Sequence, residues 1–334
     1  MILVLSTPSD THAAAVLRVL AARGADAVLA DLSDFPRAAT VAMRYDGGAS
    51  SAELSLADGR RIDLHTCTAI WWRRPQPFVL HDQVQRATHR NFAYNECLEA
   101  FAGLWQTLEP LWINHPTRDE VAARKAFQLR IAQGVGLRIP RTLITNDPVA
   151  ARVFAEALGG RCIYKAFSAT VTEWRETRLL GERERGQFDA VRYAPVIFQE
   201  YIEGTDLRVT VIGERIFPAA IHAHESRYQV DFRMDMMHAR TEATTLAPET
   251  EGKLRAFMRR LGLVYGAIDL RRTKGGEDVF LEINPSGQWL FIEERTKQPI
   301  TEALADVCLS TCAPKPTPRR MPRARHLTRV SAAS

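Results

Sequence analysis

The sequence predicts an α/β (α+β) protein with two or three compact units, and three observations support this prediction. The 334 residues are 46% hydrophobic and 25% charged, which is typical of a soluble globular chain with several cores. Strand-like and helix-like segments alternate from the first residues onward. Residues 265–271 and 278–284 alternate in polarity around a Thr-Lys-Gly-Gly tip, which is the pattern of an antiparallel hairpin.

The first unit, residues 1–115, has a βαβ-like opening. A strand over residues 2–5 is followed by an Ala- and Leu-rich helix that ends at Gly24, and residues 27–32 form a second strand. Neither GxGxxG nor GxxxxGK[ST] occurs in the chain, so this opening lacks the glycine-rich phosphate loops of nucleotide-binding folds. We therefore expect any phosphate site to lie elsewhere.

The rest of this unit contains short strands, a long helix and a basic strand end. Glycine turns separate strands around Met43, Leu54 and Ile62, which predicts a hairpin appended to the first sheet. A helical pattern covers about 81–108, and a short segment at 111–116 closes the unit.

The strand Ala-Ile-Trp-Trp at residues 69–72 runs directly into Arg73 and Arg74. Both arginines have an ordinary interpretation as surface residues. Their planar guanidinium groups at a strand end also suit carboxylates or phosphates, and we favour that interpretation.

The second unit, residues 116–195, begins with the capping-box pattern Thr117-x-x-Glu120. It predicts one helix to about Gln133, with Lys125 on it. A second lysine, Lys165, lies in a mostly apolar strand, where a lysine needs an anionic partner such as phosphate. Residues 168–187 are polar and predict a mobile loop over a site.

The third unit, residues 196–312, begins with a buried type of strand that breaks into acidic residues at a turn. In the next strand the alternation places Asp206 and Arg208 on one face. A helix is expected at about 248–261. His222 and His224 share a strand face, but two histidines without a third ligand are a weak metal signal.

The predicted hairpin at 265–284 carries the strongest chemical signal. With a symmetric loop, Asp269 lies opposite Phe280, and period-two alternation then divides the side chains. One face is expected to carry Asp269, Phe280, Glu282 and Asn284, and the other Val279, Leu281 and Ile283. Two carboxylates and an amide oxygen on one side suit Mg²⁺. A solvated acidic hairpin is the alternative from spacing alone.

Charge and cysteine content narrow the class of protein. Residues 313–334 hold six of the 44 basic residues and no acidic one, and the remaining charges nearly balance. This predicts a disordered basic tail and no nucleic-acid surface on the fold. Five cysteines without CxxC pairs indicate a reduced compartment. The N-terminus lacks a signal peptide or membrane span, so a cytoplasmic protein without a membrane partner is expected.

Several of these features occur together in one known family. In order along the chain they are Lys125, Lys165, the segment Gln199-Glu200-Tyr201-Ile202, Asp269, Glu282 and Asn284. Over residues 115–310 this combination resembles the ATP-grasp ligases, in the branch that contains ribosomal-protein glutamate ligases. The segments Trp71-Trp72-Arg73-Arg74-Pro75, Asp231-Phe232-Arg233 and 281–289 (Leu-Glu-Ile-Asn-Pro-Ser-Gly-Gln-Trp) are similar to the graspetide synthetases, the microviridin-type peptide macrocyclases.

The resemblance implies an ATP-grasp fold with three domains and a site for ATP and Mg²⁺. The domains would be a Rossmann-like pre-ATP-grasp domain (1–115), a central domain (116–195) and a C-terminal domain (196–312). ATP would lie between the last two domains. Its phosphates would meet Lys125 and Lys165, its adenine Gln199, Glu200, Tyr201 and Ile202, and its ribose Glu203 or Asp206. Mg²⁺ would be held by Asp269, Glu282 and Asn284.

The resemblance also implies the reaction and the partner. Asp or Glu side chains of a ribosomal precursor peptide would be activated as acyl phosphates and joined to Ser or Thr hydroxyls or Lys amines. The leader of this peptide would bind mainly to the central domain, its acidic core would meet Arg73, Arg74 and Arg233, and the enzyme would be a homodimer.

Two departures from the family pattern affect the phosphate site. Residues 168–180 contain no glycine, and no arginine stands two residues before Asp269. Arg208, Arg233 or Arg271 is expected to replace that arginine. Two alternatives remain: a glutamate-ligase-like enzyme that adds an amino acid to a protein or peptide, and a non-catalytic ATP-binding interaction protein.

Overall fold

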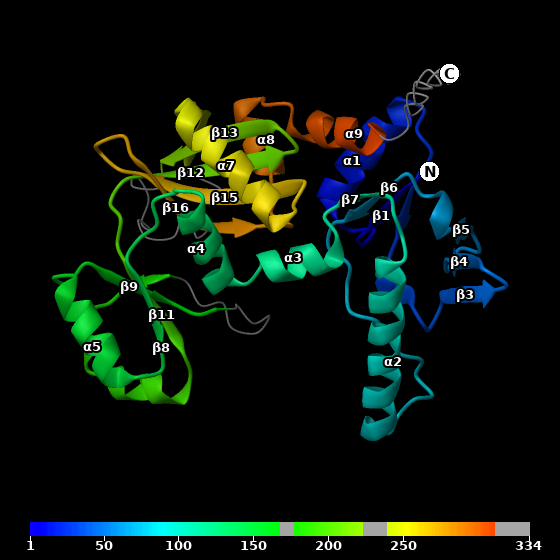
Figure 1. Cartoon of the computed structure of the whole chain (residues 1–334), viewed down its shortest axis with the longest axis horizontal. Helices are drawn as coiled ribbons and strands as arrows, with labels where there is room; N and C mark the ends of the chain where they lie inside the picture. Colours follow the sequence, from blue (N-terminus) through cyan, green and yellow to red (C-terminus); the bar gives the residue numbers. More distant parts are fainter. Residues whose placement is uncertain (168–176, 223–238, 311–334) are drawn as a thin grey trace, which may run out of the picture.

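The computed structural model describes residues 1–167, 177–222 and 239–310. Three sheet-based parts follow one another along the chain (Figure 1). The first contains a parallel sheet in the order β2-β1-β6-β7. Its elements are β1 (Ile2–Leu5), α1 (Thr11–Ala22), β2 (Ala27–Ala30), η1 (Leu32–Asp34), β6 (Ala69–Trp72), α2 (Ala87–Gln106) and β7 (Leu111–Ile113). The βαβ opening predicted from the sequence is confirmed.

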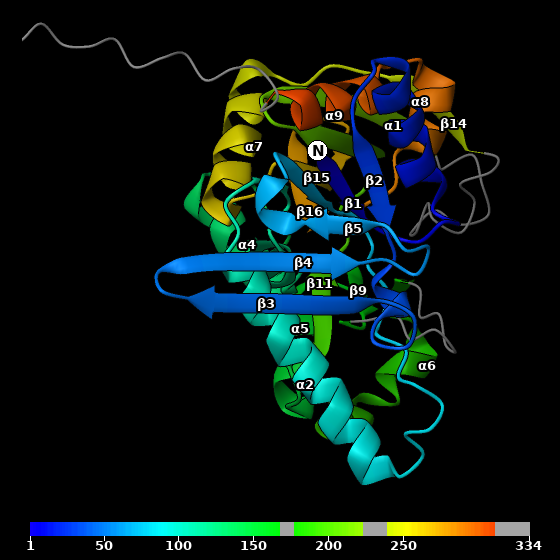
Figure 2. The ribbon, with the colours of Figure 1, turned by 90° about the vertical axis from the view of Figure 1, so that its right-hand side faces the viewer.

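The strands after β2 form a sheet of their own. It has the order β3-β4-β5 and contains β3 (Thr40–Asp46), β4 (Ala49–Ser55) and β5 (Arg61–Asp63), followed by η2 (Leu64–Thr66). The hairpin of β3 and β4 extends across the face seen in Figure 2. The expectation that these strands extend the first sheet is therefore wrong, because β4 pairs only with β3 and β5 among the described strands.

The central sheet has the order β10-β9-β11-β8. It consists of β8 (Thr142–Thr145), β9 (Cys162–Lys165), β10 (Arg178–Leu179) and β11 (Val196–Glu200), with α5 (Pro148–Ala157), α6 (Glu182–Arg185) and η3 (Phe188–Tyr193). β11 pairs with both β8 and β9, so the strand assigned to the third unit completes the sheet of the second. Residues 168–176 lie outside the described part, but β10 and α6 occupy the end of the predicted loop.

Two short helices replace the single helix predicted after residue 116. They are α3 (Pro116–Ala122) and α4 (Lys125–Gly134). The predicted capping box is wrong, because His115 is the N-cap and its ring accepts a hydrogen bond from the Thr117 N–H at 3.3 Å. The break places Lys125 at the first position of α4.

The sheet of the third part, called the third sheet below, has the order β14-β13-β12-β15-β16. Its strands are β12 (Thr205–Ile212), β13 (Arg215–His222), β14 (Arg240–Ala243), β15 (Tyr265–Arg272) and β16 (Asp278–Asn284), and its helices are α7 (Pro248–Leu261), α8 (Leu290–Thr296) and α9 (Ile300–Leu309). One face buries Leu207, Val209, Ile268 and Leu270 against α7 and α4. This leaves the opposite face for polar residues.

A β-bulge changes the register of the hairpin formed by β15 and β16. Asp269 pairs with Glu282 and Leu270 with Phe280, so Leu281 is the extra residue. The predicted pairing of Asp269 with Phe280 is wrong. Phe280 instead lies on the core face with Leu270 and Ile283.

The bulge does not disturb the predicted grouping of the polar side chains. Asp269 pairs with Glu282 and Ala267 with Asn284, so all three polar residues lie on one face. That part of the prediction is confirmed.

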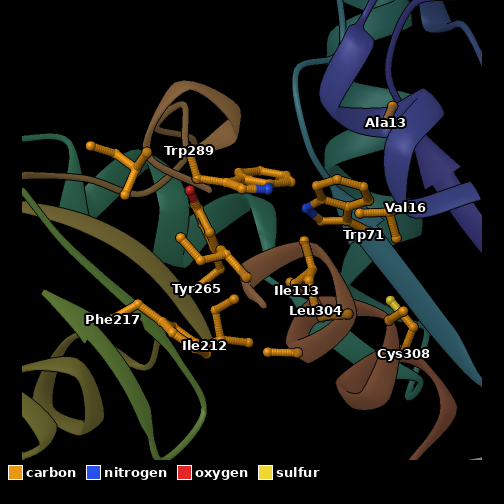
Figure 3. Close-up of a cluster of buried hydrophobic side chains, with 14 of the residues drawn as sticks. Ala13, Val16, Trp71, Ile113, Ile212, Phe217, Tyr265, Trp289, Leu304 and Cys308 are labelled. Carbon is orange, nitrogen blue, oxygen red and sulfur yellow. The ribbon is translucent and has the colours of Figure 1, made fainter. Parts of the chain in front are cut away.

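The largest apolar cluster joins the first and third parts of the chain. It brings together Val16 of α1, Trp71 of β6, Tyr265 of β15 and Leu304 of α9, with Trp289 from the residue just before α8 (Figure 3). The indole rings of Trp71 and Trp289 have centroids 6.0 Å apart. α9 therefore packs on α1 and β6 of the first part as well as on β12 of the third part.

Gly204 connects the central sheet to the third sheet at a very close backbone approach. A Cβ placed there would lie 1.9 Å from the Arg272 carbonyl oxygen, and its φ is +157°. We expect Gly204→Ala to lower the free energy of unfolding by about 2 kcal/mol or more, because a backbone atom must move. The urea midpoint measures this change. Gly275→Ala is the control, since its nearest heavy atom lies at 3.8 Å, and equal midpoints for both variants would contradict the prediction.

Across the parts of the chain that the structure describes, no helix is both long enough and apolar enough to span a membrane.

Candidate active site

The polar face of the third sheet holds a row of alternating charges. Arg208 of β12 pairs directly with Asp269 of β15, and Asp269 pairs with Glu282 of β16. Two residues away along the same pair of strands, Asp206 lies opposite Arg271. Directly opposed residues share a face, so this row is built by strand register alone.

Two lysines reach this row from separate elements. The Lys125 Nζ lies 2.6 Å from Glu282 Oε2, and the Lys165 Nζ lies 4.0 Å from the same oxygen. Lys125 begins α4, whereas Lys165 ends β9 in the central sheet. The site therefore lies where the central sheet meets the third sheet, and the sequence prediction that these residues act together is supported by their position.

Arg208 supplies a further buried cation beside the carboxylates. Its Nη1 donates to Asp269 Oδ1 at 2.7 Å. Its Nε is buried and has no hydrogen-bond partner within the described ranges. A buried guanidinium N–H without an acceptor is costly, so a bound anion at this point would stabilise it.

The donor set fits Mg²⁺ by its chemistry. Asp269, Glu282 and Asn284 present carboxylate and amide oxygens on one sheet face, as hard cations require. The described residues contain no cluster of three or more His, Cys, Asp or Glu that could hold a metal ion. The third donor here is an amide, so this result is compatible with the Mg²⁺ assignment.

The segment after β11 presents two kinds of side chain. Gln199 is buried and donates to Thr142 Oγ1 at 2.9 Å. The Glu200 carboxylate accepts from the Arg141 N–H at 3.1 Å, and as the next residue of β11 it points to the face opposite that of Gln199. Ile202 is buried. The Gln199 and Glu200 side chains thus both have hydrogen-bond partners within the central part of the chain.

The two proposed ribose contacts both have charged partners. Asp206 is buried and lies 2.8 Å from Arg271 Nη2. The guanidinium of Arg271 also lies 5.9 Å from the ring centroid of Tyr201. Glu203 is more exposed and pairs with Lys274 at 2.6 Å. Arg271 therefore links β15 to the segment that follows β11.

Arg73 and Arg74 lie at the junction of the N-terminal part with the turn after β16. Arg73 is only 1% exposed, and its Nη1 donates to the carbonyl oxygens of Ser286 at 2.6 Å and Gly287 at 2.9 Å. Arg74 is half-buried and donates to the same Ser286 oxygen at 3.1 Å and 3.2 Å. Arg74 is thus the more accessible of the two.

Sequence reasoning missed three polar residues at this junction, namely Asp10, His12 and Asp119. Asp10 pairs with Arg73 Nε at 3.1 Å. Burial would raise the pKa of Asp10, but hydrogen bonds from His12 and Ser6 and the charge of Arg73 together hold it far below its usual range. The only sequence signal was the position of Asp10 in the turn after the first strand. Its partners come from distant segments.

Asp119 gives a pH-dependent prediction. Burial raises its pKa to about 6, opposed by hydrogen bonds from Ser286 and Asn114. The folded state then binds this proton more tightly than the unfolded state, so the contribution to stability is largest near pH 4 and is lost as pH rises through about 6. We expect Asp119→Asn to raise the urea midpoint above that of the wild type at neutral pH, with no difference near pH 4.

The control for this pH effect is Asp58→Asn, because hydrogen bonds from Arg60 lower the pKa of that exposed carboxyl. The urea midpoint of Asp58→Asn should not rise above that of the wild type at neutral pH. A midpoint difference for Asp119→Asn that does not change with pH would contradict the prediction.

Some predicted residues lie outside the described part of the chain. They are Arg233, with its neighbours Asp231 and Phe232, and His224. The basic tail also lies there, since the description ends at residue 310. His222 is described, and its Nε2 lies 2.9 Å from Glu242 Oε1.

Comparisons with known proteins agree with this arrangement. A family model described as "MvdD pre-ATP grasp domain" matches residues 1–120. The structure of macrocyclase MdnC from Microcystis aeruginosa MRC, bound with precursor peptide MdnA, is 27% identical, with 92% of this chain and 98% of that chain covered and a TM-score of 0.81.

Two further solved structures have similar sequence identity, coverage and TM-score. Macrocyclase MdnB from the same organism is 29% identical, with 92% and 99% coverage and a TM-score of 0.76. The ATP-grasp ligase PsnB, in complex with a phosphomimetic variant of its minimal precursor, Mg and ADP, is 27% identical, with 93% and 98% coverage and a TM-score of 0.76. A comparison with curated protein sequences gave no match.

The pre-ATP-grasp match covers the N-terminal part, and the structural matches span nearly the whole chain with the fold predicted from the resemblance. The chain thus has the fold of the solved ATP-grasp macrocyclases and ligases, is similar to them over nearly its whole length, and carries a pre-ATP-grasp domain match at residues 1–120.

Proposed function

We propose that this protein is an ATP-dependent macrocyclase that crosslinks side chains of a ribosomal precursor peptide. The observation that carries the proposal is the convergence of Lys125, Lys165 and Arg208 on the carboxylates of Asp269 and Glu282 at one sheet face. Such a site offers both cations for phosphates and oxygens for a metal ion. MdnC and PsnB, which share the fold, were solved with precursor peptides.

ATP would bind between the central sheet and the third sheet. The segment from Gln199 to Ile202 would meet the adenine, with Glu200 as a hydrogen-bond acceptor and Glu203 or Asp206 toward the ribose. Lys125 and Lys165 would hold the phosphates, because the ammonium groups of both lie close to Glu282 of the proposed Mg²⁺ set. Bound Mg²⁺, held by Asp269, Glu282 and Asn284, would neutralise phosphate charge and orient the γ-phosphate.

The chemistry requires activation because a carboxylate has no competent leaving group. A carboxylate oxygen of an Asp or Glu in the peptide attacks the γ-phosphorus, and ADP leaves. A Ser or Thr hydroxyl, or a Lys amine, of the same peptide then attacks the acyl carbon, gives up its proton, and phosphate leaves with the former carboxylate oxygen. Arg208 is placed to offset the negative charge that the two substrates bring together, with Arg233 and Arg271 as the other proposed phosphate contacts.

The peptide is proposed to approach along the junction that Arg74 occupies. Its leader would bind mainly to the central domain, and its acidic core would meet Arg74, supported by Arg73 and Arg233. We expect Arg74→Ala to raise the KM for the peptide about 10-fold. Its affinity for ADP with Mg²⁺, measured without peptide, should be unchanged. An unaltered KM would contradict this contact.

We also propose that the enzyme acts as a cytoplasmic homodimer on a microviridin-type precursor. The family resemblance and the four described cysteines, which are buried and form no disulfide with one another, support a reducing compartment. Light scattering on purified protein tests the dimer, and a monomer at micromolar concentration would contradict it.

Intact mass of a precursor peptide after incubation with the enzyme, ATP and Mg²⁺ tests the reaction. A candidate is an acidic, Thr-rich peptide encoded beside the gene. Loss of one water per crosslink, absent in Lys165→Met, would support the proposal. A mass gain equal to an amino acid would favour a glutamate-ligase-like enzyme instead. ATP binding without hydrolysis in the presence of several such peptides would favour a non-catalytic binding protein.

A further inference from the structure

The turn after β16 determines how Asn284 is presented. The Asn284 Oδ1 accepts a hydrogen bond from the Ser286 N–H at 2.9 Å, and the Gly287 N–H donates to the Asn284 carbonyl oxygen at 3.2 Å. An amide oxygen has two lone pairs, so one remains for a metal ion. The direction of that lone pair depends on the conformation of residues 284–287.

A buried arginine of the N-terminal part holds this turn. Arg73 Nη1 binds two consecutive carbonyl oxygens, those of Ser286 and Gly287. Its guanidinium carbon lies 5.1 Å from the ring centroid of Trp289, and its Nε is paired with Asp10. An arginine held on three sides and 1% exposed is rigid.

His12 holds the other end of the turn. Its Nε2 accepts from the N–H groups of Trp289 at 3.2 Å and Leu290 at 3.4 Å. Burial lowers the pKa of His12, which favours the neutral ring that such an acceptor requires. The Nδ1 faces Asp10 Oδ1 at 3.5 Å, so Asp10 links His12 with Arg73.

The turn packs closely against β15 at Gly287. A Cβ at Gly287 would lie 2.3 Å from the Ala267 Cβ and 3.5 Å from Arg208 Nη2. The Tyr265 hydroxyl donates to the Gly287 carbonyl oxygen at 2.9 Å. Any displacement of the turn is therefore transmitted to β15, which carries Asp269.

We propose that Arg73 is a positioning residue of the metal site: with Asp10 and His12 it holds the turn at 284–289 so that Asn284 faces the same cation as Asp269 and Glu282. The N-terminal part is then a component of the Mg²⁺ site, although it contributes no ligand. This inference rests on the proposed function, which assigns Asn284 to the metal. Groups that orient metal ligands commonly change metal affinity 10- to 100-fold.

Calorimetric titration with ADP, with and without Mg²⁺, tests this role without a peptide. We expect Arg73→Lys, which keeps the charge but loses the planar fork, to bind ADP normally without Mg²⁺. The enhancement of ADP binding by Mg²⁺ should fall about 10-fold or more. The control is Arg272→Lys, because Arg272 makes a similar two-point contact with Asp278 at the far end of the same hairpin.

A second variant keeps the test decisive if Arg73→Lys fails to fold. Tyr265→Phe removes only the hydroxyl bound to Gly287 and should lower the Mg²⁺ enhancement about threefold. The inference is overturned if Mg²⁺ enhancement is normal in a folded variant, or if ADP affinity falls equally with and without Mg²⁺. A wild type without any Mg²⁺ enhancement would overturn the metal assignment itself, and the inference with it.

Discussion

Replacing Glu282 by Gln is expected to lower turnover at least about 100-fold while the protein remains folded. Glu282 is the point where the two lysines meet, with the Lys125 Nζ at 2.6 Å and the Lys165 Nζ at 4.0 Å. It is also one of the two carboxylates in the proposed Mg²⁺ set. Glutamine has the same shape but no charge, so it removes the negative charge needed by the metal ion and leaves the packing in place.

ADP release in the presence of precursor peptide and Mg²⁺ measures this effect. Glu277→Gln is a matched control, because Glu277 lies in the same hairpin and pairs with Arg138 outside the carboxylate row. The control should keep its activity. Turnover of Glu282→Gln within about threefold of the wild type would refute both the metal assignment and the role of the lysine pair.

Replacing Trp289 by Ala is expected to lower the free energy of unfolding by about 3–5 kcal/mol. Trp289 is fully buried and packs near Tyr265 and Trp71 (Figure 3), with ring centroids at 5.5 Å and 6.0 Å. The His12 ring centroid lies 4.6 Å from that of Trp289. Its indole N–H also donates to Thr301 Oγ1 at 3.0 Å. The substitution leaves a cavity where the N-terminal and third parts join.

Urea unfolding followed by far-ultraviolet circular dichroism measures this loss. Trp289→Phe is the conservative comparison, because it keeps most of the ring volume and loses the hydrogen bond to Thr301. Its effect should be clearly smaller. A loss below about 1 kcal/mol for Trp289→Ala would mean that this cluster does not hold the two parts together.

The shared face of the three oxygen donors was readable from sequence because period-two alternation assigns faces locally. Asp269, Glu282 and Asn284 share a face as predicted. The register was not readable, because the bulge at Leu281 arises when Phe280 is drawn into the core with Leu270. Tertiary packing therefore moved one apolar residue and left the polar set unchanged.

The boundaries between units were less predictable. β11 follows a polar segment and precedes the third sheet, yet it pairs in the central sheet. The split between α3 and α4 likewise follows from where Ala122 and Ala132 pack against the third sheet. Local patterns contain no information about which sheet receives a strand or a helix.

By itself, the sequence determined the α/β class, the order of the two lysines and the oxygen donors, and the resemblance to ATP-grasp ligases, because these depend on residue type and short spacing. Only the tertiary structure decided what Arg73 does. In the sequence it is one of two adjacent arginines at a strand end. In the fold it is buried between Asp10 and the turn after β16, more than two hundred residues away along the chain. Contacts between such distant segments form only when the domains pack together.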